Sequence, residues 1–199
     1  MMKKIVFLFL TTLLAACGEG GFSVEECNVI GESGDGIMPL KVVTNRDDSL
    51  FLRRQSRPLL REHLESAEFE VLCERMLATV NDPLNEGVGI AAPQVGLDYA
   101  LVAVQRFDKA GEPFEFYANP AIGWRSESMS AGGEGCLSVP ELYGEVMRHD
   151  SVEVVYVHPT TMMPVTELVT GFTAVIFQHE IDHLSGTLYT DRAHTITRE

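Results

Sequence analysis

Apolar residues recur at helical spacing in two segments of this chain. In residues 61–80, Leu64, Leu72 and Val80 belong to one apolar face, and the pattern ends at an Asn-Asp-Pro sequence that stops a helix. Residues 172–184 are apolar over most of their length and have the composition of a buried helix. The hydrophobic pattern therefore predicts an amphipathic helix in the first half of the chain and a buried helix near its end.

Four shorter segments have the composition of strands. Residues 99–107 and 114–117 are rich in aromatic and β-branched residues and are separated by a turn sequence. Residues 152–157 and 165–169 form a second such pair, joined by a turn that contains proline. Because the strands are grouped before a late helix and do not alternate with helices, their order favours an α+β fold.

The first seventeen residues have the pattern of a signal peptide. Lys3 and Lys4 precede an uncharged, mostly apolar run over residues 5–16, which is too short to span a bilayer as a helix. The run ends in Leu-Ala-Ala before Cys17, and this ending resembles the lipobox of bacterial lipoproteins, in which the cysteine is lipidated and becomes the new N-terminus. The alternative is a buried N-terminal strand or helix that contains a cysteine by chance.

The lipobox resemblance implies export and a lipid anchor on Cys17 at the periplasmic side of a bacterial membrane. Gly18, in place of an aspartate, favours the outer membrane. The cytoplasm is the alternative location. Residues 18–36 are rich in Gly, Glu and Ser without apolar periodicity and predict a flexible tether. Residues 37–199 then form one globular domain.

Composition limits the partners and leaves two cysteines undecided. Hydrophobic residues make up 45% of the chain and charged residues 22%, as is usual for a soluble globular domain. The net charge of -14 argues against nucleic acid as a partner, because a polyanion requires a basic face. Cys27 and Cys73 could pair in an oxidising compartment, or Cys73 could be a buried free thiol, and spacing alone does not decide.

The late helix carries a metal-ligand pattern. His179 and His183 are four residues apart, so both imidazoles project from one helical face, and Glu180 can reach water at a metal held there. Cys136 supplies a further ligand, because a thiolate with two imidazoles leaves a fourth position open, as a catalytic site needs. Taken separately, two structural histidines and a small buried cysteine are the simpler interpretations.

A third segment is rich in glycine and reads GVGIAAPQ over residues 87–94. Its glycines let another chain approach the backbone closely, and Gln94 offers an amide donor to a developing oxyanion. A Gly-rich turn before a strand is the structural alternative. A phosphate-binding loop is excluded, because no GKS or GKT sequence follows.

Together these segments resemble the signature motifs of peptide deformylases. The motifs are GVGIAAPQ at residues 87–94, EGCLS at residues 134–138 and QHEIDHL at residues 178–184, in this order. The resemblance runs from about residue 38 to residue 191 and makes residues 37–199 a deformylase-like catalytic domain. It implies an α+β fold in which antiparallel sheets pack around a central helix that bears the two histidines. It also implies hydrolysis of N-formylmethionyl peptides with release of formate.

The resemblance further implies a role for each matched residue. The metal ligands are Cys136, His179 and His183. Glu180 acts as general base and then as general acid, while Gln94 and the backbone N–H of Leu137 bind the oxyanion. Gly89 meets the substrate backbone. The methionine pocket is lined by Val88, Phe172, Val175 and Ile176.

Four neighbouring residues bear on these roles. Glu134 and Asp182 are expected to orient the metal ligands through hydrogen bonds. Arg148 matches a recurrent basic position of the family. Tyr143 stands where several members of the family have an arginine near the substrate, so peptide preference is expected to differ.

The sequence does not decide which metal is bound, and two alternative functions remain to be considered. The resemblance implies iron(II), while zinc(II), nickel(II) and cobalt(II) also suit sulfur and nitrogen ligands. One alternative function is a non-catalytic envelope lipoprotein that binds formyl peptides or metal. The other is a zincin-type peptidase, which shares the His-Glu-x-x-His spacing but would need a further ligand downstream and leaves Cys136 and Gln94 unexplained.

Overall fold

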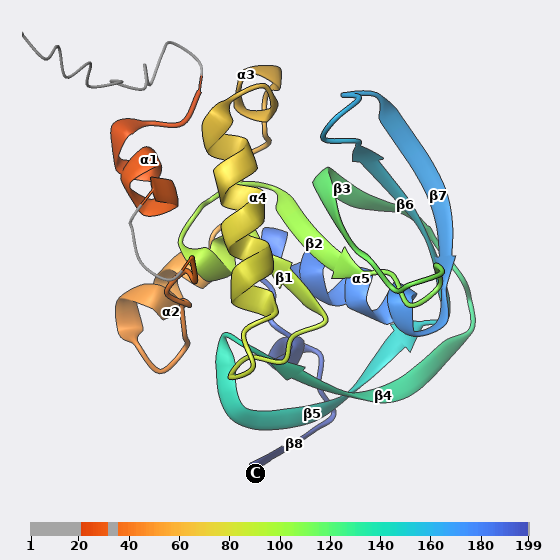
Figure 1. Ribbon diagram of the computed structural model, residues 1–199. Coiled ribbons are helices and arrows are strands. Elements are labelled where there is room, and N and C mark those ends of the chain that lie inside the picture. The colour runs from red at the N-terminus through yellow and green to blue at the C-terminus, as the bar shows by residue number, and fades with distance from the viewer. Residues whose placement is uncertain (1–20, 32–35, 199) are drawn as a thin grey trace, which may run out of the picture.

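Two antiparallel sheets pack around one helix in this protein (Figure 1). The computed structural model describes residues 21–31 and 36–198. The predicted signal peptide and its Cys17 lie outside the described residues, as do residues 18–20 and 32–35 of the predicted tether. No helix in the described part of the chain is long and apolar enough to cross a membrane.

The larger sheet has five strands in the order β1-β2-β3-β6-β7, all paired antiparallel. Its inner face is apolar and fully buried at Val102, Val104 and Val154. All four segments predicted as strands belong to this sheet. The strand bounds are β1 Gly89–Ala91, β2 Leu101–Gln105, β3 Phe114–Arg125, β6 Ser151–Val157 and β7 Pro164–Thr170.

The smaller sheet has three strands, β4 Met129–Cys136, β5 Val139–His149 and β8 Thr195–Arg198, in the order β4-β5-β8. The pairing of β4 with β5 is interrupted between Glu134 and Cys136. This irregularity lies at the end of β4, so it sets the direction in which the Cys136 side chain leaves the strand.

Helix α5, Gly171–Leu184, is the predicted buried helix and lies between the two sheets (Figure 1). Ala174 and Phe177 on this helix are completely buried against the five-stranded sheet. The predicted fold, antiparallel sheets around a central helix that bears the histidine pair, is confirmed.

The other predicted helix is divided in two, as α3 Arg61–Leu64 and α4 Ala67–Val80. The break occurs at Ser66, whose hydroxyl accepts a hydrogen bond from the Phe69 N–H and caps α4. Helical periodicity alone does not reveal the break, because the apolar positions continue across it. The short helix α2, Arg46–Leu52, and the 3-10 turns at Ala92–Val95 and Tyr189–Asp191 were not predicted.

The N-terminal segment differs from the predicted tether. Residues Val24–Gly31 form helix α1, which packs on α4, and Phe22 and Ile30 are buried in the core. The Arg75 side chain on α4 donates hydrogen bonds to the carbonyl oxygens of Val29 at 3.0 Å and Ile30 at 2.7 Å. The prediction failed here because α1 is short and is held by contacts with distant residues.

The cysteine pair predicted as one alternative is not formed. Cys73 on α4 has a free thiol, so it is not joined to Cys27. Burial raises the pKa of the Cys73 thiol to about 12, which keeps it protonated and unreactive. Of the two interpretations left open by the sequence, the free and partly buried thiol is correct.

Candidate metal centre

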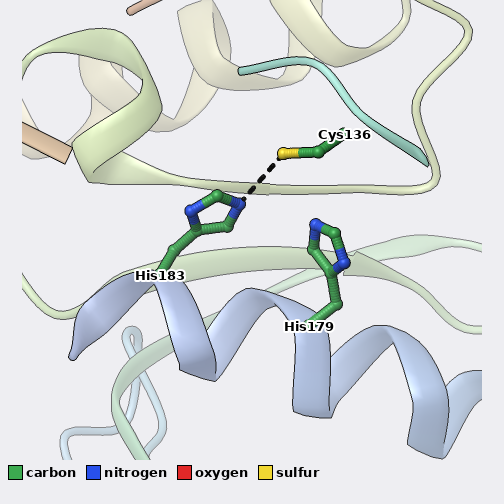
Figure 2. Close-up of side chains that lie close together, drawn as sticks. All are labelled: Cys136, His179 and His183. Carbon is green, nitrogen blue, oxygen red and sulfur yellow. Dashed lines mark hydrogen bonds between the residues drawn. The ribbon is translucent and has the colours of Figure 1, made fainter. Parts of the chain in front are cut away.

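Three side chains that can bind a metal meet beside the C-terminal half of α5. One donor atom each from Cys136, His179 and His183 lies within 4.8 Å of the other two. Cys136 Sγ is 3.3 Å from Nε2 of His183, and Figure 2 shows the thiol and both imidazoles pointing toward one another. The two histidines come from consecutive turns of α5, and the cysteine comes from the end of β4.

The His179 ring is fixed by a carboxylate behind it. Its Nδ1–H donates to Glu134 Oε2 at 2.8 Å, which leaves Nε2 to face Cys136. Glu134 is in turn held by Arg148, whose Nε and Nη2 donate to its two oxygens at 2.7 and 2.9 Å. A carboxylate on the second ring nitrogen selects the tautomer that binds metal through Nε2.

The expected role of Asp182 is indirect. Among the described residues, Asp182 forms no hydrogen bond with either imidazole. Its carboxylate accepts hydrogen bonds from Arg148 at 2.6 Å and from Arg192 at 2.6 and 2.7 Å. Arg148 therefore joins Glu134 on β4 to Asp182 on α5. Burial tends to raise the pKa of Glu134, but Arg148 and His179 lower it to about 2.

The surroundings of Cys136 favour its thiolate, which is the form that binds metal. Burial opposes ionisation of Cys136, but the nearby imidazoles of His183 and His179 lower the pKa of its thiol to about 5. Contact with Cys136 and Glu134 raises the pKa of His179, although burial acts in the other direction. A thiolate facing two imidazoles, close enough to share one ion, fits a divalent metal of the iron or zinc type.

Glu180 lies beside these ligands and is nearly inaccessible, with 4% of its surface exposed. Its Oε2 is buried and has no hydrogen-bond partner among the described residues. Burial raises the pKa of the Glu180 carboxyl to about 7. A carboxylate with this proton affinity, pointing into a cavity, can take and return a proton near neutral pH.

Gly89 makes room for Glu180. A Cβ atom on Gly89 would lie 2.4 Å from Glu180 Oε1 and 2.8 Å from Ile176 Cγ2, so a larger residue would displace both side chains. The close approach of β1 to α5 therefore explains one glycine of the GVGIAAPQ motif, in addition to the expected contact of its backbone with substrate.

The Gln94 amide has a defined orientation next to Cys136. Its Oε1 accepts from the Ala91 N–H at 2.9 Å, so its amino group points toward Ser138 Oγ at 3.3 Å and Cys136 Sγ at 3.6 Å. Ser138 is fully buried. Sequence reasoning missed its contact with Gln94, and its place in the EGCLS motif was the available signal.

A cavity of about 510 Å³ opens from these residues. All four side chains predicted for the methionine pocket line it, together with Gly89 and Leu137. Phe172 is exposed at the edge, whereas Ile176 is buried at the wall. Tyr143, which was expected near the substrate, also lines the cavity, whereas the contributions of residues 84–86 and of β5 up to Leu142 were not predicted.

The sequence matches a family model described as polypeptide deformylase over residues 39–199. The peptide deformylase of Symbiobacterium thermophilum is 38% identical over 141 residues, which cover 71% of this chain and 61% of that protein. The peptide deformylase of Methylocella silvestris is 36% identical over 165 residues, which cover 81% of each chain.

The fold is also similar to solved structures of the same kind. A class I type b peptide deformylase from Acinetobacter baumannii, solved with Met-Ala-Ser bound, superposes with a TM-score of 0.69 at 34% sequence identity. The similarity covers 78% of this chain and 98% of that chain. It therefore includes nearly the whole of the solved protein and about three-quarters of this chain.

Proposed function

This chain belongs to the peptide deformylase family, and we propose that it removes the formyl group of N-formylmethionyl peptides through Glu180 and a metal held by Cys136, His179 and His183. The observation that carries the residue assignment is the meeting of a thiolate, two imidazoles and an unpaired buried carboxylate at one cavity. The chain is a metal-dependent hydrolase. Neither the zincin-type peptidase nor the non-catalytic lipoprotein is favoured by the comparisons.

Glu180 moves the proton in this mechanism. When bound, the divalent ion supplies a Lewis acid that polarises the formyl carbonyl and makes water more acidic. Glu180 accepts a proton from the attacking water and later donates it to the departing amine nitrogen. The C–N bond of the formyl amide breaks, and the products are formate and a peptide with a free N-terminus.

Gln94 and the backbone N–H of Leu137 stabilise the charge that develops on the formyl oxygen. The Gln94 amino group is already aimed at the metal side of the site, because Ala91 holds the amide oxygen. A donor that is fixed before the reaction needs no reorganisation when charge appears.

The methionine side chain occupies the apolar part of the cavity. Val88, Val175 and Ile176 contribute aliphatic surface there, and Phe172 closes the edge by packing its ring against Phe107 at 5.2 Å. Gly89 has no side chain, so the peptide backbone can pass close to Glu180.

Formate release tests the assignment. The full chain, purified in mild detergent and loaded anaerobically with iron(II), is expected to release formate from formyl-Met-Ala-Ser. Cys136→Ser is expected to lose bound metal and activity together, because it removes the thiolate ligand. Metal bound at full occupancy with no formate released would instead favour the binding-protein alternative, and cleavage inside the peptide would favour the peptidase.

The proposed metal is iron(II), as the family resemblance implies. Zinc(II), nickel(II) and cobalt(II) fit the same donor set. Zinc would resist oxidation better at an exported site, since iron(II) with a thiolate ligand is the more oxidisable combination. Metal analysis of protein purified from the cell envelope distinguishes the two, and turnover after loading with each ion shows which supports the reaction.

We also propose that the chain is exported and anchored through lipid on Cys17 at the periplasmic side of a membrane, in the outer membrane where there are two. The basic, apolar and small residues of the segment before Cys17 support this.

Labelling with a radioactive fatty acid tests this localisation. The full chain is expected to take up label and to sediment with membranes, and Cys17→Ser is expected to lose both properties. An unlabelled chain recovered with cytoplasmic proteins would contradict the proposal and support the alternative location.

A further inference from the structure

A buried arginine that the mechanism does not use follows strand β2. Only 2% of the surface of Arg106 is exposed. Its Nε and Nη2 donate to the two carboxylate oxygens of Asp108 at 2.8 and 2.6 Å. Its Nη1 donates to the Tyr117 hydroxyl at 2.6 Å, to Glu167 at 2.7 Å and to Glu115 at 3.3 Å. The guanidinium therefore has partners on β3 and β7 and in the turn that follows β2.

Stability alone does not account for this cluster. Taking a guanidinium and carboxylates out of water is costly, and apolar side chains in the place of a buried ion pair are often equally stable. A planar guanidinium that forms two parallel hydrogen bonds does fix the direction of its partner. Because Asp108 is two residues after Arg106, the pair closes the turn at residues 106–108 and fixes Phe107 between them.

The turn at residues 106–108 packs against the start of α5. The Phe107 ring lies 5.2 Å from the ring of Phe172, which is the second residue of the helix. Phe172 lines the cavity and has 55% of its surface exposed, so the contact with Phe107 limits where its ring can lie. A movement of the turn would therefore move one wall of the methionine pocket.

A second contact joins the turn to the first turn of α5. The Arg106 guanidinium lowers the pKa of Asp108 to about 2, and a hydrogen bond with the buried Thr173 side chain contributes as well. The negative carboxylate is thus held beside the N-terminal end of α5, where the helix dipole favours it. Among the described residues, α5 has no acidic residue in its own first turn and no side-chain cap from Thr170.

We propose that Arg106 and Asp108 are positioning residues: they hold the first turn of α5, and with it the Phe172 wall of the methionine pocket. This inference rests on the proposed function and deepens it. The two residues are not among the described residues that line the cavity, so they act through the helix. Glu180 lies about two turns further along α5, so proton transfer is expected to continue without the pair.

The first test is Asp108→Ala, because this side chain is 31% exposed and its removal leaves no large void. The KM for formyl-Met-Ala-Ser is expected to rise about tenfold, with kcat within about twofold of the parent. For formyl-Ala-Ala-Ser, which lacks the side chain that fills the pocket, kcat/KM is expected to change by less than about twofold. A general loss of structure would lower kcat/KM for both peptides alike.

Glu115→Ala is the matched control, because Glu115 is also a carboxylate partner of Arg106 and is 34% exposed, but lies on β3. It is expected to keep the parent KM for both peptides. A second pair of variants tests the same contact from the helix: Thr173→Val should raise KM, and Thr173→Ser, which keeps the hydroxyl, should not. An equal rise of KM in Asp108→Ala and Glu115→Ala, or an equal loss of kcat/KM for both peptides, would overturn the inference.

A binding measurement separates this inference from the proposed function. Acetyl-Met-Ala-Ser-amide is titrated by calorimetry against the metal-loaded full chain, since the acetyl group allows binding to be measured without formate release. Binding about tenfold weaker in Asp108→Ala than in the parent and in Glu115→Ala would support the positioning role even if no formyl peptide were hydrolysed. Formate release by the parent, with the same affinity in the parent and Asp108→Ala, would support the function and reject the positioning role.

Discussion

Helix α5, which bears the proposed metal ligands, and the N-terminal helix α1 are each held by a buried arginine, but the partners of the two arginines differ. Arg148 pairs with the carboxylates of Glu134 and Asp182 and so links β4 to α5. Arg75 binds backbone carbonyls at the end of α1 and after it, namely those of Val29, Ile30, Gly36 and Ile37. The first arginine acts through side chains that titrate, and the second fixes the position of the backbone.

Because of this difference, we expect the contacts of Arg148 to affect catalysis and the contacts of Arg75 to affect stability. Around Arg148, the charges change the proton affinity of groups that touch the metal ligands, as the low pKa of Glu134 shows. The carbonyl oxygens that Arg75 binds do not titrate. Arg75 therefore affects only the position of the backbone at the end of α1 and after it. Substitutions near α5 should therefore change turnover, and substitutions near α1 should change the free energy of unfolding.

The largest expected effect is on turnover at α5. Glu180→Gln is expected to lower kcat by about 1,000-fold, because the amide cannot carry the proton from water to amine. Stability and metal content should stay at the parent level or rise, since an unpaired buried carboxylate is removed. Formate release, metal analysis and thermal unfolding measure the three properties.

Glu74→Gln, an exposed substitution on α4, serves as the control for this change. A Glu180→Gln enzyme that kept more than about a tenth of its turnover would show that another group moves the proton.

The next largest effect is expected in the N-terminal region. Arg75→Met leaves several carbonyl oxygens without their donor and is expected to lower the free energy of unfolding by about 3 kcal/mol. Turnover of the folded, metal-loaded protein should stay within about twofold of the parent, since α1 does not contact the cavity. Urea unfolding and formate release measure the two quantities.

Arg46→Met, at an exposed position of α2, is the matched control for Arg75→Met and is expected to change neither quantity. A loss of turnover in Arg75→Met equal to its loss of stability would contradict the separation of the two regions.

A smaller effect on turnover is expected at β1. In Gly89→Ala the new Cβ would lie 2.4 Å from Glu180 Oε1, so the carboxylate must move. A shift of about 1 Å in a catalytic group lowers kcat/KM by about 100-fold. Gly132→Ala on β4 has no neighbour within 4 Å of its new Cβ and should retain full kcat/KM. Comparable kcat/KM in both alanine variants would contradict the inference that Gly89 is needed to leave room for Glu180.

The smallest expected effect is the pH dependence of the α1 region. Burial acts to raise the pKa of Glu26, but the Ser23 N–H and Arg57 hold it below the usual 4.5. A lowered folded pKa means that this carboxylate stabilises the protein above the unfolded pKa and loses its contribution as pH falls through the folded value. The stability difference between parent and Glu26→Gln should be full at pH 7 and shrink below pH 4.5.

Urea unfolding at a series of pH values checks the Glu26 prediction. Glu25→Gln, next to it on α1 and exposed, is the control for the loss of one negative charge. A stability difference between the parent and Glu26→Gln that increased toward low pH would contradict the lowered pKa of Glu26 in the folded protein.

Residues close in sequence carried most of what could be predicted. The i, i+4 spacing of His179 and His183 places them on one face in any helix, so the metal pattern was readable before the fold was known. The same holds for α5 and for the strands of the five-stranded sheet, whose composition and period are local properties.

Contacts between residues far apart in the sequence could not be predicted from local patterns. Some were implied by the resemblance to a known family, and others were not predicted. Cys136 reaches His183 across 47 residues, and Gln94 reaches Ser138 across 44. The resemblance to a family supplied the first contact but not the second. The helix α1 and its attachment to Arg75, 45 residues away from Ile30, contradicted the predicted tether, because a short segment with few apolar residues becomes helical through packing.

The sequence by itself determined the metal-ligand pattern, the buried helix, the strand segments and the family. Glu134 was expected to orient a metal ligand, but only the tertiary structure decided that this ligand is His179 and that Arg148 holds the carboxylate. Only the tertiary structure showed that Gly89 makes room for Glu180 and that the cavity has no lysine or arginine among its described lining residues. The physical reason is that spacing along a chain encodes which face a side chain occupies. What lies opposite that face depends on how the sheets and helices pack.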